Sequence, residues 1–331
     1  MYDLCIADAR ALPFDDGCAH TCVTSPPYFG LRDYGHAGQI GLEGNIQDFV
    51  NELVGVFREV RRVLRDDGTL WLNLGDSYAG AGLGGGTQNQ GIHAYPKGNT
   101  VQARTGARRV GNLKPKDLMG VPWHVAFALQ ADGWFLRSDI IWHKPNPMPE
   151  SIKDRPTKAH EYLFLFAKSE RYFYDADAVK EQIRSTAPSG NSSTGRQGGG
   201  SRMGVLSGGE GTSKRWQPTG KKNKRSVWTV TTKPYKGAHF ATYPPELIEP
   251  CILAGSPEGG TVLDPFTGSG TTGAVAIKHG RRFIGTELNP DYGELARERM
   301  TRALEASGRA TVKNTAPGDR VQLGLNLGGV G

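Results

Sequence analysis

Residues 261–287 carry the pattern that most constrains the fold of this chain. A short apolar segment, 261–264, is followed by a glycine-rich turn, by a segment with helical character at 271–279, and by a second apolar segment at 282–285. Strand, turn, helix and strand in close succession form a unit in which the two strands run parallel and the helix covers one face. The pattern therefore predicts an α/β fold.

Residues 46–74 also show a helix pattern followed by a strand pattern. Apolar side chains recur every three or four positions, which predicts an amphipathic helix over 46–64. Asn45 is a suitable N-cap, Asp67-Gly68 is the expected stop, and 69–74 reads as a buried strand. Further strands are expected at 3–9, 20–24, 135–142, 161–168 and 226–230, and further helices at 121–129, 245–254 and 291–305.

Two stretches lack any periodicity and predict inserts in the sheet domain. We expect a catalytic half of the domain, a Gly-rich basic insert, a continuation of the catalytic half, a variable basic region, a cofactor-binding half and a loose tail. Their expected limits are 1–78, 79–116, 117–175, 176–225, 226–306 and 307–331.

Composition excludes several classes of protein. No apolar run approaches the roughly 18 residues that a membrane helix needs, and the first ten residues show no secretory signal pattern. Four scattered cysteines do not make a disulfide framework, which favours a cytoplasmic location in a bacterial or phage-infected cell.

Positive charge is concentrated in the two inserts. Residues 97–116 hold six basic and no acidic side chains, and 180–225 hold ten basic and two acidic ones. The two stretches together carry +14, so the remainder carries −7 and the whole chain +7. This distribution is typical of a protein that binds nucleic-acid phosphates, although solvated loops of the same composition would look alike.

The glycine-rich turn has the chemistry of a nucleoside site. Gly268 and Gly270 allow the backbone to approach a ligand closely. Glu287 follows Asp264 by 23 residues, at the end of the next strand, where a carboxylate accepts hydrogen bonds from ribose hydroxyls. No Gly-Lys-Ser/Thr occurs in the turn, so it is not a phosphate-binding loop.

A second motif, Ser25-Pro26-Pro27-Tyr28, follows the strand expected at 20–24. The prolines fix the backbone and remove two N–H donors, which leaves oxygen acceptors facing outward. Such a turn suits a ligand that presents an NH₂ group. Tyr28 and Phe29 add flat faces on which a planar base can stack.

Taken together, the two motifs resemble those of the amino-group DNA methyltransferases that use S-adenosyl-L-methionine. Ser25 to Tyr28 match the catalytic Asp/Asn/Ser-Pro-Pro-Tyr/Phe motif, and Asp264 to Thr272 match the cofactor loop Asp-Pro-Phe-x-Gly-Ser-Gly-Thr-Thr. The catalytic motif comes first and the cofactor loop near the end, which is the order of the β subgroup. The resemblance covers roughly 1–78, 117–175 and 226–300. It implies a permuted, Rossmann-like sheet of seven mostly parallel strands with helices on both faces.

The resemblance also implies residue roles. The catalytic residues are Ser25, Pro26, Pro27 and Tyr28. The cofactor-binding residues are Asp8 at the adenine, Glu287 at the ribose, and Asp264, Phe266, Gly268, Gly270 and Thr271 along the loop. Thr242 is placed at the methionine carboxylate, where many relatives have Thr-x-Lys-Pro and this chain has Thr242-Tyr243-Pro244.

An exocyclic amine is a poor nucleophile because its lone pair is delocalised into the ring. Oxygen acceptors on Ser25 and on the Pro26 carbonyl would draw the nitrogen toward tetrahedral geometry, and the base must leave the duplex to reach them. In the family, Ser at the first catalytic position is more frequent for cytosine N4 and Asp for adenine N6. Ser25 therefore favours cytosine N4, with adenine N6 as the alternative.

Other chemistries have weaker support. Carbon-5 methylation of cytosine needs a Cys nucleophile, and Cys251 is expected on a buried helix face. Cys18, His20 and Cys22 have the wrong spacing for a zinc site, so no metal is expected. An RNA or protein amine methyltransferase and an inactive DNA-binding module both remain open.

Double-stranded DNA is the expected partner, together with a possible cognate restriction endonuclease. The middle region is expected to read the DNA sequence. The candidate phosphate contacts in the two inserts are Arg108, Arg109, Lys221, Lys222, Lys224 and Arg225.

Overall fold

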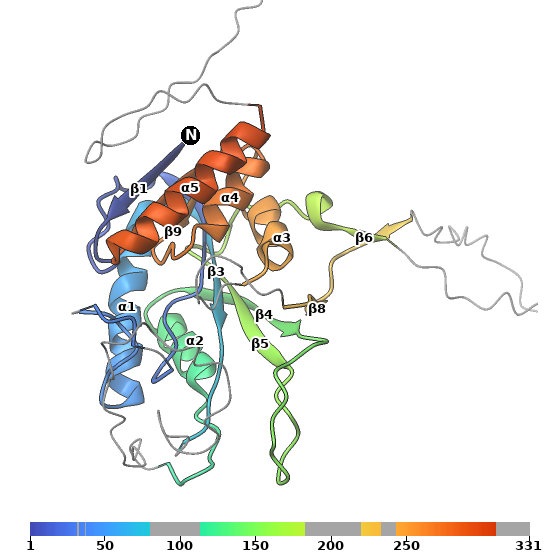
Figure 1. Ribbon diagram of the computed structural model, residues 1–331. Coiled ribbons are helices and arrows are strands. Elements are labelled where there is room, and N and C mark those ends of the chain that lie inside the picture. Colours follow the sequence, from blue (N-terminus) through green and yellow to red (C-terminus); the bar gives the residue numbers. More distant parts are fainter. Residues whose placement is uncertain (32, 37, 80–112, 183–219, 233–242, 309–331) are drawn as a thin grey trace, which may run out of the picture.

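The computed structural model describes most of the chain (Figure 1). The described residues are 1–31, 33–36, 38–79, 113–182, 220–232 and 243–308. Most of both expected inserts, and the tail after residue 308, therefore lie outside the described residues.

One large sheet organises the described part of the chain. Its strand order is β1-β10-β9-β2-β3-β5-β4-β8, and only β5 runs antiparallel to its neighbours. The strands are β1 (Tyr2–Ile6), β2 (Ala19–Thr24), β3 (Leu64–Leu74), β4 (Phe135–His143), β5 (His160–Ala167), β8 (Val227–Thr229), β9 (Thr261–Asp264) and β10 (Arg282–Glu287). The described sheet thus has eight strands rather than the expected seven, and β8 pairs with β4 at one edge.

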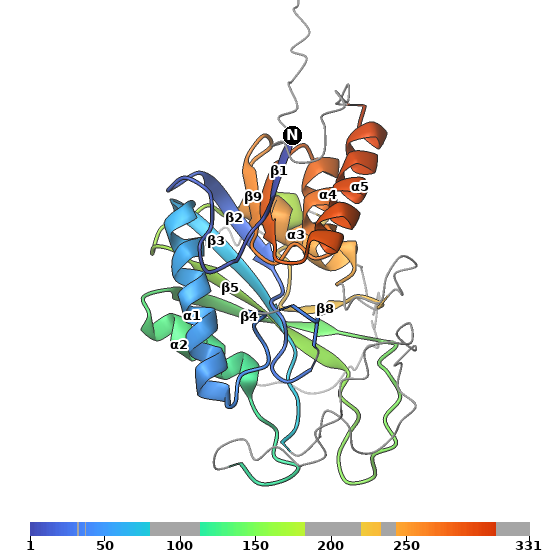
Figure 2. The same ribbon diagram turned by 60° about the vertical axis from the view of Figure 1, so that its left-hand side comes forward.

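Helices cover both faces of the sheet (Figure 2). One face carries α1 (Ile46–Val63) and α2 (Val121–Ala131), and the other carries α3 (Pro245–Gly255), α4 (Thr271–Lys278) and α5 (Pro290–Ala306). Each face of the described sheet has its own cluster of buried apolar side chains. The predicted α/β class, the mostly parallel sheet and the two covering layers are confirmed.

Helix α1 illustrates where the sequence pattern was right and where it was wrong. The Asn45 side chain accepts the Asp48 N–H, as a good N-cap does, and the apolar stripe is buried. The stop expected at Asp67-Gly68 is wrong, because the helix ends at Val63 and β3 begins at once. The β2–β3 register shifts between Ala19 and Thr21, so the charged residues after Leu64 form an irregular start of the strand rather than a helix end.

A small ribbon projects beyond the sheet. Strands β6 (Glu181–Gln182) and β7 (Lys221–Lys222) pair antiparallel, after the short 3₁₀ helix η1 (Asp177–Val179). The ribbon brings the two described segments that flank residues 183–219 side by side (Figure 1). Among the described helices, none is long and apolar enough to span a bilayer.

The parallel strands bring their carboxyl ends to one edge of the sheet. Both sequence motifs begin there: Ser25 follows β2 directly, and Pro265 follows β9, the neighbour of β2. Glu287 is the last residue of β10, and Asp8 lies two residues beyond β1, which ends at Ile6 rather than near residue 9 as predicted. In open α/β sheets ligands bind at this edge.

Candidate active site

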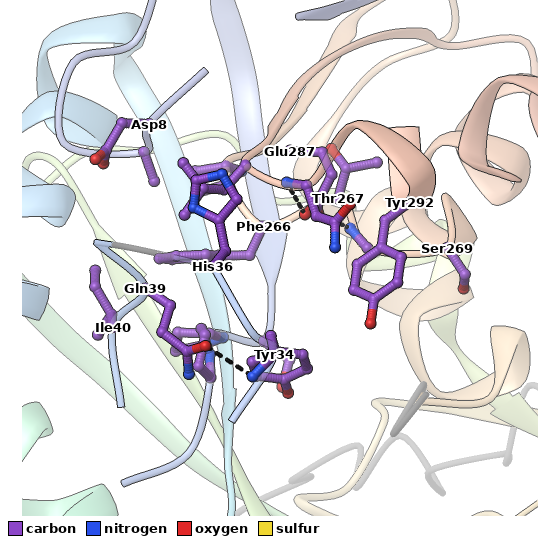
Figure 3. Close-up of a pocket in the computed structure, with 18 of the residues that line it drawn as sticks. Asp8, Tyr34, His36, Gln39, Ile40, Phe266, Thr267, Ser269, Glu287 and Tyr292 are labelled. Carbon is purple, nitrogen blue, oxygen red and sulfur yellow. Dashed lines mark hydrogen bonds between the residues drawn. The ribbon is translucent and has the colours of Figure 1, made fainter. Parts of the chain in front are cut away.

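A cavity opens at the carboxyl edge, between the ends of β1, β10, β9 and β2 (Figure 3). It is closed on another side by Leu31, Tyr34, His36 and Gln39 and by Tyr292 at the start of α5. The residues predicted for the site that line it are Asp8, Ser25, Pro26, Pro27, Tyr28, Phe266, Gly268, Thr271 and Glu287. The structure therefore brings residues from both motifs, more than 230 positions apart, to one cavity.

The turn after β2 presents oxygen acceptors to this cavity. Ser25 and Pro26 both line it, and no hydrogen bond among the described residues uses the Pro26 carbonyl oxygen. The expected stacking face of Phe29 is wrong, since its ring is only 4% exposed and packs on Phe49 with ring centroids 5.5 Å apart. Tyr28 is the aromatic residue of this turn that faces the cavity.

The Tyr28 hydroxyl is held by a network behind the cavity. It donates to a Glu161 carboxylate oxygen at 2.7 Å and lies 3.2 Å from the Asn73 side-chain oxygen. Glu161 in turn forms an ion pair with Lys144, and the Ser25 hydroxyl donates to the Tyr28 oxygen at 3.5 Å. Burial, reinforced by the Glu161 charge, raises the pKa of Tyr28 well above its usual value, so the hydroxyl stays protonated and acts as a donor.

Gly75 fixes the tilt of the Tyr28 ring. A Cβ at position 75 would lie 2.5 Å from a carbon of that ring, so only glycine allows the ring to lie against the backbone after β3. Together with the Glu161 bond, this contact holds the ring at two points.

Asp264 has a different place from the one predicted. Its side chain is 1% exposed and does not line the cavity. The carboxylate accepts hydrogen bonds from the hydroxyls of Thr24 and Thr272, both at 2.6 Å, and from the Phe266 N–H at 3.0 Å. Asp264 therefore ties the end of β2, the loop and α4 together. Burial raises its pKa to about 6, and the hydrogen bonds oppose that shift.

The two glycines of the loop have separate tasks. Gly268 lines the cavity, has a φ of +51°, and donates its N–H to a Glu287 oxygen at 2.8 Å. Gly270 does not line the cavity; it precedes α4 with a φ of +78°, and a Cβ there would lie 2.9 Å from the Ala296 Cα of α5. Gly270 thus serves helix packing rather than ligand contact.

Glu287 is aimed into the cavity by the backbone around it. One carboxylate oxygen accepts the Gly268 N–H and the other accepts the Asn289 N–H at 2.9 Å. Each oxygen keeps a free lone-pair direction, which is what two adjacent ribose hydroxyls require. Burial raises the pKa of Glu287, and the backbone donors counteract this.

The remaining cofactor candidates differ in how they are held. Asp8 lines the cavity and is bound to Arg10, whose guanidinium lowers the pKa of the Asp8 carboxyl. The Thr271 hydroxyl accepts a hydrogen bond from Arg299 at 2.7 Å. Thr242 lies outside the described residues, but Tyr243 lines the cavity, and its hydroxyl bonds to that of Thr272.

The candidate DNA contacts are not part of the cavity. Lys221 and Lys222 form β7, Lys224 lies over the Trp228 ring, and Arg225 pairs with Glu181 at 3.0 Å. Arg108 and Arg109 lie outside the described residues.

The cysteines have structural surroundings. Cys251 is fully buried in α3, and burial raises the pKa of its thiol far above the usual value, as expected of a side chain that is no nucleophile. His20 accepts the Thr261 N–H on its Nδ1 at 3.0 Å, and all four cysteines are free thiols. Within the described ranges, no three His, Cys, Asp or Glu side chains gather as metal ligands do.

Several residues of the site carried no sequence signal that we recognised. Asn73 of β3 and Glu161 of β5 bond to Tyr28, and Lys144, the residue after β4, pairs with Glu161. An acidic residue near the start of an otherwise apolar strand, as Glu161 is in β5, is the one pattern that could have drawn attention to Glu161. His36 and Tyr292 also line the cavity and were not predicted (Figure 3).

Known proteins resemble the chain over most of its length. The family model N6_N4_Mtase, described as DNA methylase, matches residues 19–298. The Type II methyltransferase M.XycI of Xanthomonas campestris pv. cyanopsidis is 50% identical over 293 residues, which are 88% of this chain and 83% of the relative.

Solved structures share the fold. The PvuII DNA methyltransferase (cytosine-N4-specific) superimposes with a TM-score of 0.58 at 19% identity, covering 93% of this chain and 91% of the other. M1.HpyAVI, solved as a complex with SAM, superimposes with a TM-score of 0.52 at 16% identity, covering 91% and 99%.

Proposed function

The chain belongs to the N6_N4_Mtase family of S-adenosyl-L-methionine-dependent amino-group DNA methyltransferases, and from this premise we propose that it methylates the N4 nitrogen of cytosine at a specific DNA site. The observation that carries the proposal is the meeting of the Ser25–Tyr28 turn and Glu287 in one cavity. Adenine N6 is the alternative target.

The residues of the cavity fit the cofactor. Glu287 offers two carboxylate oxygens with free lone pairs to a ribose, and Asp8, held ionised by Arg10, lies at the β1 side for the adenine. We propose that Phe266, Gly268 and Thr271 line the path between the ribose and the turn after β2. When bound, the cofactor supplies an electrophilic methyl group on a sulfonium.

The chain's own residues prepare the nucleophile. The Ser25 hydroxyl oxygen and the Pro26 carbonyl oxygen accept hydrogen bonds from the target amino group, which localises the nitrogen lone pair and stabilises the positive charge that develops on it. The Tyr28 ring, anchored through Glu161 and packed on Gly75, gives the extrahelical base a fixed surface to stack on. Positioning and charge stabilisation supply the catalysis.

Ser25 is the ground for choosing cytosine N4. Ser is the more frequent residue at this position in N4-specific family members, and the PvuII enzyme with the same fold is described as cytosine-N4-specific. Its low identity to this chain limits that likeness to the fold, so the choice rests on Ser25.

DNA binding outside the cavity is assigned to the basic region. We propose that residues 176–225 recognise the target, with Lys221, Lys222, Lys224 and Arg225 on phosphates. Arg108 and Arg109 of the other insert are proposed to contact phosphates as well. The description of relatives as Type II methyltransferases supports a cognate endonuclease as a functional partner.

The test is product identification. The purified chain is incubated with mixed-sequence DNA and S-adenosyl-L-methionine, and the digested nucleosides are analysed by mass spectrometry. N4-methylcytosine is expected, lost in Ser25→Ala and retained in Cys251→Ala. N6-methyladenine would overturn the base assignment, 5-methylcytosine would overturn amino-group chemistry, and no product would overturn DNA as the substrate.

A further inference from the structure

A second hollow lies on the sheet face that carries α3, beside the β8 edge. It is lined by side chains from three strands of the sheet, from β8 and from the segments at 172–174 and 224–226. The lining residues used below are Trp71, Arg137, Tyr174, Lys224, Arg225 and Trp228. None of them lines the first cavity, and the proposed methyl transfer uses none of their rings.

The walls of this hollow are aromatic. The Trp71 and Tyr174 rings are nearly parallel, at 25°, with centroids 6.3 Å apart, and the Trp228 ring lies 6.4 Å from Trp71. Trp71 forms the floor, being 1% exposed, whereas Tyr174 at the rim is 40% exposed. The Tyr174 ring, exposed at the rim and backed by the buried Trp71 indole, is a flat face of the kind that nucleobases stack on.

The floor contains a polar atom that lacks an acceptor. The Trp71 indole nitrogen is buried and forms no hydrogen bond with any described residue. A buried donor without an acceptor costs about 1–3 kcal/mol. The Trp228 indole nitrogen, by contrast, donates to the Arg225 carbonyl at 2.6 Å. That nitrogen is shielded from the surface, so the ring that a ligand can reach is Tyr174 at the rim.

Three cations surround the rim. Lys224 lies 4.6 Å from the Trp228 ring centroid and Arg137 lies 5.6 Å from that of Tyr172. Neither forms an ion pair within the described part of the chain, while Arg225 is neutralised by Glu181 at 3.0 Å. The hollow therefore has a net positive rim over an aromatic floor, a combination that fits a planar ligand with a negative charge.

We propose that this hollow binds a nucleotide, with its base against the exposed Tyr174 ring and its phosphate at Lys224 and Arg137. Along β3, Trp71 lies two residues before Asn73, on the same face, and Asn73 contacts the Tyr28 hydroxyl. The hollow is thus about 7 Å along the strand from the catalytic network. A nucleotide of the DNA outside the methylated base is the source we favour, which rests on the proposed function; free mononucleotides share the same chemistry.

The test is binding, measured by calorimetry on the full chain with the four deoxynucleoside monophosphates. Saturating S-adenosylhomocysteine is present so that the first cavity is blocked. Tyr174→Leu removes the exposed ring at the rim, and Lys224→Gln removes a charge of the rim. Each is expected to weaken binding roughly five- to tenfold. Arg58→Gln, an exposed cation on the opposite face of the sheet, is the matched control and should change nothing.

Binding of equal strength in all variants, or no binding at all, overturns the proposal. The second arm compares a duplex with one unpaired nucleotide against the fully paired duplex. Preference for the unpaired form that is lost in Lys224→Gln identifies DNA as the source, and no preference overturns that assignment in favour of free nucleotides. Because neither arm needs turnover, failure of methylation and failure of this site are separate results.

Discussion

The Tyr28 hydroxyl donates a 2.7 Å hydrogen bond to Glu161, a residue 133 positions away on the only antiparallel strand of the described sheet. The Lys144 ammonium pairs with the other oxygen of the same carboxylate. The orientation of Tyr28 is therefore set largely from outside the turn that contains it, by β5 and the residue after β4 together with Asn73 and Gly75. This arrangement makes Glu161 a positioning residue whose contribution depends on the Tyr28 hydroxyl.

A double-mutant cycle tests that dependence. Tyr28→Phe keeps the ring and removes its anchor, and a hydrogen bond to a charged group is worth about 1.5–3 kcal/mol. We expect kcat to fall about tenfold or more, with unchanged affinity for S-adenosyl-L-methionine. Glu161→Gln keeps an acceptor at the same place and should lose less than Glu161→Ala.

The double variant Tyr28→Phe/Glu161→Ala is expected to resemble Tyr28→Phe alone, because the second change removes a partner that is already idle. If the changes in activation free energy of the two single variants add up in the double variant, Glu161 acts independently of Tyr28. Thermal melting of each variant separates this outcome from general destabilisation through the unpaired Lys144.

Glu287 offers a direct test of the cofactor assignment. Glu287→Ala removes both oxygens that we propose bind the ribose, and charged hydrogen bonds of this kind are worth about 1.5–3 kcal/mol each. Affinity for S-adenosyl-L-methionine, measured by calorimetry, should fall at least tenfold. Glu294→Ala, an exposed carboxylate on α5, is the matched control. Equal affinities in the two variants would remove Glu287 from the site.

The raised pKa of Asp264 predicts that the stability of the protein depends on pH. Its carboxyl has a pKa of about 6 when folded and an ordinary value near 4 when unfolded, so the native state binds the proton more tightly. Stability from this group is therefore present at low pH and is lost as the pH rises through 6. Wild type should gain about 1 kcal/mol over Asp264→Asn when the pH is lowered from 7 to 5.

Urea denaturation at the two pH values measures this difference. Subtracting the free energy of unfolding of Asp264→Asn from that of the wild type removes the contributions of the other titrating groups, which both proteins share. A difference that stays constant, or that changes in favour of Asp264→Asn, would contradict the raised pKa.

The contrast between Asp264 and Glu161 shows how far the sequence could be read. Asp264 belongs to a contiguous motif, so its place next to the cavity was predictable. Its role was not predictable, because the carboxylate accepts hydrogen bonds from threonine hydroxyls of β2 and α4. The bond from β2 joins residues 240 positions apart and leaves no local pattern in the sequence. Glu161 acts through contacts between distant strands and belongs to no motif. Periodicity located the helices and strands well, because burial of one face is a local property of the sequence.

The two misplaced features have different physical causes. Phe29 was expected at the surface as a partner of Tyr28, yet adjacent side chains point in different directions, and Phe29 packs into the α1 side of the core. The end of α1 was placed at Asp67-Gly68 because those residues favour turns, whereas strand pairing with β2 takes over at Leu64. Tertiary pairing overrode local preference in the second case.

Gly270 predicts a steric effect that can be separated from backbone strain. Gly270→Ala places a residue with φ near +78° and a Cβ 2.9 Å from the Ala296 Cα. Gly259→Ala, the control, has a φ of +75° and no atom within 4 Å of its Cβ. Both should lose about 1 kcal/mol to the left-handed backbone, and Gly270→Ala about 1–3 kcal/mol more, from urea denaturation. Equal losses would mean that α4 and α5 adjust freely.

The basic ribbon predicts the salt dependence of DNA binding. Each phosphate contact releases a counterion and contributes about 0.9 to the slope of log K against log salt concentration on duplex DNA. Lys221→Gln/Lys222→Gln should therefore weaken binding and flatten that slope by roughly 2. Arg58→Gln/Arg302→Gln, two cations with exposed side chains on α1 and α5, remove the same charge elsewhere. A slope that falls equally in both double variants would show that net charge, and not the ribbon, attracts the DNA.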